Sequence, residues 1–66
     1  MRLRELARRN ESGILVRLLW DTARGQTLIR YRDRRSGECF AADVPNALAL
    51  EAFRHPNAFR PASPSL

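Results

Sequence analysis

The chain has 66 residues and a formal net charge of +5, because 12 Arg and no Lys stand against 7 acidic residues. A chain this short forms one domain and buries only about 60% of its unfolded surface, so its core is marginal in size. The single cysteine excludes an internal disulfide, and one Cys with one His cannot complete a structural zinc site. We therefore expect no metal and no cofactor, and we expect stability to come from association, which favours a homodimer.

The N-terminal segment carries a helical pattern. Leu3, Leu6 and Ala7 recur at the i, i+3, i+4 spacing of one helix face. Glu5 precedes two Arg residues at the spacing of helical ion pairs. The pattern predicts a short helix over residues 2–9, which Ser12 and Gly13 would stop.

Three later segments predict strands. Residues 14–20 form the most apolar run, with Trp20 on one side and Arg17 on the other. Such a strand is usually covered on both sides, so its second side needs the N-terminal helix or a second subunit. Residues 27–33 alternate between apolar and polar, and residues 39–44 follow a Gly-containing turn. The short connections favour an antiparallel meander in chain order.

A second helix is predicted over residues 46–55, after Pro45 and before Pro56, with a broad apolar arc facing the sheet. The predicted fold is therefore α+β, a three-stranded antiparallel sheet with the C-terminal helix on one face. The domain would span residues 1–60, and the Pro/Ser-rich residues 61–66 would form a frayed tail. The predicted core consists of Ile14, Val16, Leu18, Trp20, Ile29, Tyr31, Phe40, Ala42, Val44, Leu48, Ala49, Phe53 and Phe59.

Three short motifs carry a resemblance to a known group of proteins. They are Leu-Leu-Trp at residues 18–20, Gly-Glu-Cys-Phe at 37–40 and Ala-Phe-Arg-His-Pro at 52–56. With these motifs the chain resembles a family of small uncharacterised Arg-rich actinobacterial proteins. The family has a strand ending in Leu-Leu-Trp, a Gly-Glu-x-Phe turn and an Ala-Phe-x-His-Pro helix end. The resemblance implies no activity.

Catalytic chemistry has little support in the sequence. Cys39 and His55 are the residue types of a nucleophile and its base, but such a pair must lie within hydrogen-bond reach. Cys39 adjoins the core residue Phe40, where a cysteine usually acts as a small inert hydrophobe. His55 falls in the last helical turn, where the helix dipole favours a cation. We expect no catalytic residue and no enzymatic activity.

The Arg residues give one candidate for binding. Arg17, Arg30 and Arg32 alternate away from the apolar sets of their strands, so they project from one side of the sheet, with Arg34 and Arg35 in the adjoining turn. Such a basic face predicts weak, salt-sensitive nucleic-acid binding. Sheets that bind single strands usually add exposed aromatics, whereas the aromatic residues here are predicted in the core.

Leu15, Leu19 and Leu28 share the Arg-bearing side of the sheet. A mixture of Arg and apolar side chains is typical of protein interfaces. Foremost, therefore, we expect a non-enzymatic interaction or assembly module that forms a homodimer or binds another protein through these leucines. Nucleic-acid binding is the alternative. A single free thiol, no secretion signal and no apolar run near the about 20 residues of a membrane span favour a cytoplasmic protein.

Overall fold

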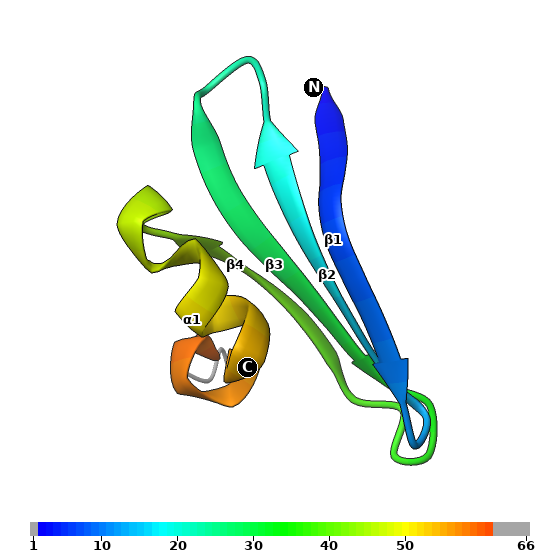
Figure 1. The fold of residues 1–66 in the computed structure, drawn as a ribbon. Coiled ribbons are helices and arrows are strands. Elements are labelled where there is room, and N and C mark those ends of the chain that lie inside the picture. The colour runs from blue at the N-terminus through cyan, green and yellow to red at the C-terminus, as the bar shows by residue number, and fades with distance from the viewer. Residues whose placement is uncertain (1, 62–66) are drawn as a thin grey trace.

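A computed structural model describes residues 2–61 of the chain. It has an α+β fold in which one antiparallel sheet carries a short helical segment on one face (Figure 1). The strands are β1 (Leu3–Glu11), β2 (Ile14–Asp21), β3 (Gln26–Asp33) and β4 (Cys39–Val44), and they lie side by side in chain order. The chain then forms the 3-10 turn η1 (Asn46–Leu48), the helix α1 (Ala49–Arg54) and the 3-10 turn η2 (Pro56–Phe59).

The predicted helix over residues 2–9 is wrong, because this segment is strand β1. It pairs antiparallel with β2 from Leu3 opposite Asp21 to Glu11 opposite Ile14. Ser12 and Gly13, predicted to stop a helix, instead form a tight hairpin turn with φ of 52° and 82°. Positive φ at both central residues is the signature of a type I′ turn, which suits the twist of paired strands.

A β-bulge interrupts the alternation of β1. Glu5 lies opposite Leu19 and Ala7 lies opposite Leu18, so Leu6 is an extra residue in β1. Leu3 and Leu6 are 39% and 54% exposed, and of the three apolar residues only Ala7 packs against the core. The apolar spacing that predicted a helix therefore does not mark a buried face of this segment.

The other three strands were predicted correctly, and the helix only in part. Strands β2 and β3 each extend one residue beyond the predicted range, to Asp21 and Gln26. The predicted helix over 46–55 is divided between η1 and the shorter α1. Asn46 makes no cap for this helix. Its Oδ1 instead accepts hydrogen bonds from the backbone N–H and the hydroxyl of Thr27, at 2.9 and 2.5 Å, which ties the helix entry to β3.

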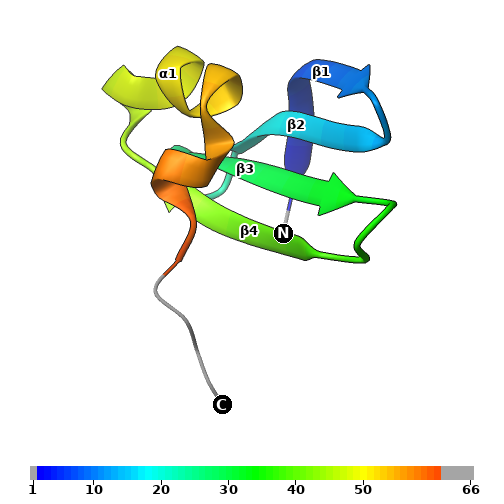
Figure 2. The ribbon, with the colours of Figure 1, turned by 90° about the horizontal axis from the view of Figure 1, so that it is seen from below.

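The core lies between the sheet and α1. Its centre consists of Leu18, Ile29, Val44 and Ala52, with Ala7, Phe40, Ala42, Ala49, Phe53 and Phe59 packed around it. Among the predicted core positions, Leu48 is 40% exposed, and Ile14 and Trp20 are half-buried and lie outside this cluster. Figure 2 shows α1 and η2 on the same side of the sheet, and within residues 2–61 no helix covers the other side.

Arg9 joins the edge strand to the end of α1. Its Nε and Nη2 donate hydrogen bonds to the carbonyl of Phe53 at 3.1 and 2.9 Å, and Nη2 also donates to the carbonyl of Arg54 at 3.1 Å. The guanidinium lies 5.4 Å from the centre of the Phe53 ring. The last carbonyls of a helix have no partner within the helix, so this side chain from β1 satisfies them.

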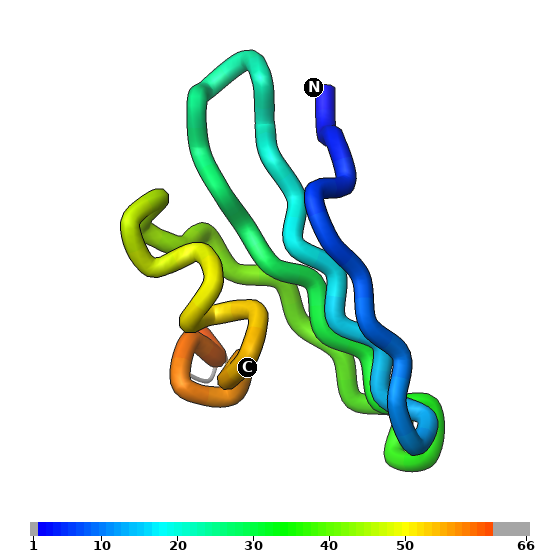
Figure 3. Tube along the Cα trace, in the orientation of Figure 1, coloured from blue at the N-terminus to red at the C-terminus, as the bar shows by residue number. Residues whose placement is uncertain are grey.

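The two hairpin turns at one end of the sheet also lie together, as the Cα trace shows (Figure 3). The backbone N–H of Arg34 donates to the carbonyl of Gly13 at 2.9 Å. The β1–β2 turn and the β3–β4 turn are therefore joined directly. Within residues 2–61, no helix has the length and apolarity needed to cross a membrane. The predicted tail lies outside the described residues apart from Pro61.

Candidate functional site

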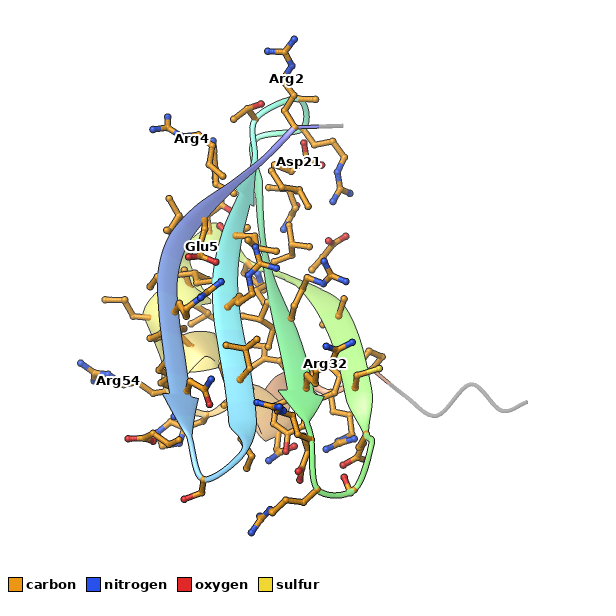
Figure 4. The ribbon with its side chains drawn as sticks, turned by 90° about the vertical axis from the view of Figure 1, so that its right-hand side faces the viewer. Arg2, Arg4, Glu5, Asp21, Arg32 and Arg54 are labelled. Atoms are coloured by element: carbon orange, nitrogen blue, oxygen red, sulfur yellow. The ribbon has the colours of Figure 1, made fainter. Side chains whose placement is uncertain are left out.

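The uncovered side of the sheet, which we call the open face, is the candidate site. Figure 4 shows this face toward the viewer, with α1 behind the strands. The strand register and the alternation of side chains place on it Leu3, Glu5, Arg8, Asn10, Leu15, Arg17, Leu19, Asp21, Gln26, Leu28, Arg30, Arg32, Cys39, Ala41 and Asp43.

Three Arg residues on the open face form one row across three strands. Arg8 lies opposite Arg17, and Arg17 lies opposite Arg30, in the registers of β1–β2 and β2–β3. Neighbouring strands are about 4.8 Å apart, so the three Cα atoms span about 10 Å. Arg32 lies two residues further along β3 on the same face. Like charges directly opposite one another destabilise a sheet, so this row costs the fold stability.

Glu5 offsets part of that charge. Arg17 Nε donates a hydrogen bond to Glu5 Oε1 at 2.7 Å, and Arg8 Nε lies 3.5 Å from the same oxygen. The hydrogen bond from Arg17 is the main cause that holds the pKa of Glu5 below its ordinary value. One carboxylate therefore serves two guanidinium groups, and both side chains on β1 and β2 are oriented by it.

Arg30 and Arg32 are exposed, and among residues 2–61 no carboxylate oxygen lies within 4.0 Å of either. Asp43 also lies on the open face, but it pairs with Arg24, whose Nη2 is 3.1 Å from Asp43 Oδ1. The same Arg24 binds Asp21 at 2.8 Å. Arg24 thus shares its one positive charge between two carboxylates, which leaves a net charge of −1 at the β2–β3 turn.

These side chains surround a shallow hollow of about 320 Å³ on the open face. The side chains of Leu15, Arg17, Arg30, Arg32, Cys39 and Ala41 line it, and Tyr31 and Phe40 also border it, although the alternation of their strands directs their rings to the covered side. Guanidinium groups bind phosphate and carboxylate oxygens with paired hydrogen bonds and remain charged at all physiological pH values. The hollow is therefore suited to an anionic group.

The five Arg residues predicted as a nucleic-acid site do not all meet. Arg17, Arg30 and Arg32 share the hollow, while Arg34 and Arg35 lie in the β3–β4 turn. Arg35 is directed toward Gly13, since a Cβ built there would lie 3.4 Å from Arg35 Cγ, and its Nε is 3.8 Å from Asp33.

Arg8 and Glu5 belong to the open face but were missing from the predicted site. Both stand in the segment that was predicted as a helix. The Ser-Gly pair at residues 12–13 was the signal for a hairpin, which would have placed β1 beside β2.

The three leucines predicted as a partner interface differ in exposure. Leu19 is only 1% exposed, so its neighbours in the same chain already cover it. Leu15 and Leu28 are half-buried. The apolar surface available to a partner here is therefore smaller than the sequence indicates.

Cys39 and His55 lie on different sides of the sheet. Cys39 is on the open face opposite Arg32, whereas His55 follows α1 on the covered side. No group of three or more His, Cys, Asp or Glu in the described part of the chain could hold a metal ion.

No protein-family model, no curated protein and no solved structure matches the chain. The resemblance to the actinobacterial family therefore stays a prediction. Any functional conclusion about this protein rests on the geometry of its open face.

Proposed function

We propose that the protein binds nucleic acid through the open face of its sheet and has no enzymatic role. The observation that carries the proposal is the row of Arg8, Arg17 and Arg30, with Arg32 beside it, in which Arg30 and Arg32 have no carboxylate partner within residues 2–61. The phosphates of a nucleic-acid backbone on this face would reduce the repulsion between the Arg residues of the row. Binding would therefore remove a destabilising interaction that is already present in the fold.

The charge on the face determines how salt should act. Arg8, Arg17, Arg30 and Arg32 together with Glu5 carry a net charge of +3, while Arg24 with Asp21 and Asp43 carries a net charge of −1 at the β2–β3 turn. Each phosphate contact on a duplex adds about −0.9 to the slope of log K against log salt. Three such contacts, one for each net positive charge, give an expected slope of about −2.7. Affinity would then fall about 40-fold between about 50 mM and about 200 mM salt.

The homodimer expected from the sequence has weaker support. A two-fold axis through the open face would set Arg17, Arg30 and Arg32 against the same residues of a second copy. Pairing through the free edge of β1 is opposed by its bulge and its Arg residues, because both features discourage edge-to-edge association. A protein partner would need an acidic surface.

The test is a titration of a fluorescent oligonucleotide of about 20 nucleotides at about 50 and about 200 mM salt, read by anisotropy. The variant R30Q/R32Q removes the two unpaired cations of the hollow. The matched control R4Q/R54Q removes the same charge from exposed residues whose side chains extend sideways past β1 in Figure 4.

We expect R30Q/R32Q to lower the affinity strongly and to reduce the salt slope by about 1.8. The control should retain most of the affinity. Equal losses in the two variants would mean that net charge alone attracts the oligonucleotide, and the proposal would be rejected. Thermal unfolding of both variants checks that the sheet is intact.

A further inference from the structure

We infer that the nucleic acid taken by the open face is double-stranded DNA, held through its phosphates and not through stacked bases. This inference rests on the proposed function. It comes from three features of the face, which are the placement of the aromatic rings, the spacing of the Arg residues and the kind of hydrogen bond that Arg can make.

The aromatic rings of the described residues are turned away from the open face. Tyr31 and Phe40 stack on each other with ring centres 5.0 Å apart on the covered side. Arg60 closes over them, 4.8 Å from the Phe40 ring, and is itself held by Glu38 at 2.6 Å. Trp20 lies on the same side by register, and Phe53 and Phe59 pack against the core.

Proteins that bind single strands obtain much of their affinity by stacking bases on exposed aromatic rings. The open face offers guanidinium groups and aliphatic side chains at the positions where such rings would stand. A duplex keeps its bases stacked inside and presents a phosphate backbone. This face therefore suits the duplex better than the single strand.

The spacing of the Arg residues fits a B-form duplex. The row from Arg8 to Arg30 spans about 10 Å between its outer Cα atoms, close to the about 12 Å width of the B-DNA major groove. Arg30 and Arg32 are separated by two strand residues, about 7 Å, which matches the rise of about two base pairs along the DNA axis. With β3 running along the groove, the outer Arg residues reach the phosphates on both sides.

An RNA duplex fits less well because its A-form major groove is deep and narrow, so side chains on a broad sheet cannot follow it. Arg donates hydrogen bonds and never accepts them, which suits the phosphate oxygens of the DNA backbone. We therefore expect contacts that carry little sequence information.

The experiment compares four labelled ligands at about 150 mM salt, which are a DNA duplex of about 20 base pairs, one of its strands, an RNA duplex of the same sequence and a DNA duplex of unrelated sequence. We expect the first duplex to bind about 10-fold more tightly than the single strand and the RNA duplex. The two DNA duplexes should bind within about 3-fold of each other, and R30Q/R32Q should abolish the difference between duplex and strand.

Each other result has a defined meaning. Equal or tighter binding of the single strand or of the RNA duplex overturns the inference and leaves the proposed function standing. A large difference between the two DNA duplexes overturns the phosphate-only contact, because it requires base readout. Absence of binding in every arm at about 50 mM salt as well rejects the proposed function itself.

Discussion

Replacing Glu5 by Gln should weaken the fold and strengthen binding at the same time. The substitution keeps the shape of the side chain but removes the charge that Arg17 contacts at 2.7 Å and Arg8 at 3.5 Å. The net charge of the four Arg residues and residue 5 then rises from +3 to +4. Each added phosphate contact multiplies the affinity by the molar salt concentration raised to the power of about −0.9. E5Q should therefore bind duplex DNA about 5-fold more tightly at about 150 mM salt and about 15-fold more tightly at about 50 mM.

The assay is the anisotropy titration across a series of salt concentrations, with urea unfolding of the same samples. The control is Glu51→Gln, which makes the same change in net charge at an exposed position of α1. We expect the salt slope of E5Q to steepen by about 0.9 and its free energy of unfolding to fall, because the Arg row loses its counter-charge.

Two results would refute this reasoning. An affinity of E5Q equal to the wild type would show that Glu5 does not compete with the ligand, so the row would not be the binding surface. An equal gain in E5Q and Glu51→Gln would show that the ligand responds to overall charge only. Either result would leave the open face without a function.

Three further changes test how the sheet is held together. Arg9→Met removes the hydrogen bonds to the carbonyls that end α1, so the free energy of unfolding in urea should fall by about 1.5–2 kcal/mol, while Arg4→Met should change it little. An equal loss in both would contradict a capping role. Gly13→Ala forces a φ near +82° on a residue with a Cβ, so the thermal midpoint by circular dichroism should fall by an amount equivalent to about 1–2 kcal/mol. An unchanged midpoint would show that the turn tolerates another backbone conformation. The hydrogen bond from Arg24 holds the pKa of Asp21 below its ordinary value of 3.8, so this carboxylate stabilises the fold above that value and loses its contribution as the pH falls through the folded-state pKa. Asp21→Asn should therefore have a lower free energy of unfolding than the wild type at pH 7. On acidification it should lose less further stability than the wild type, as measured by urea unfolding at pH 7 and at pH values below 3.8.

Much of the sheet follows from local patterns along the chain. Strands β2, β3 and β4 have side chains that alternate with period two, and Gly25 and Gly37 mark the turns between them with positive φ. The same alternation predicts that Arg17, Arg30 and Arg32 share one side. These features depend on residues close together in the sequence, so they could be predicted without the fold.

Strand β1 could not be predicted in this way. The helical spacing of Leu3, Leu6 and Ala7 marks no buried face, since both leucines are exposed, and the extended form of β1 depends on hydrogen bonds to β2. Isolated helices this short are marginal in water, so pairing with a neighbouring strand decides the conformation. Because β1 was misplaced, Arg8 and Glu5 were missing from the predicted site.

The chemical character of the open face also depends on contacts between distant segments. The sequence contains 12 Arg and 7 acidic residues but does not indicate which of them pair. Arg24 forms an ion pair with Asp43, which is 19 residues away, and Arg17 forms one with Glu5, which is 12 residues away. Arg30 and Arg32 are left without a partner among residues 2–61 because these pairs form elsewhere. Composition and periodicity thus place a basic face on this protein, whereas the register of four strands decides which of its charges are free, because ion pairs form only between side chains that the fold brings within a few ångströms.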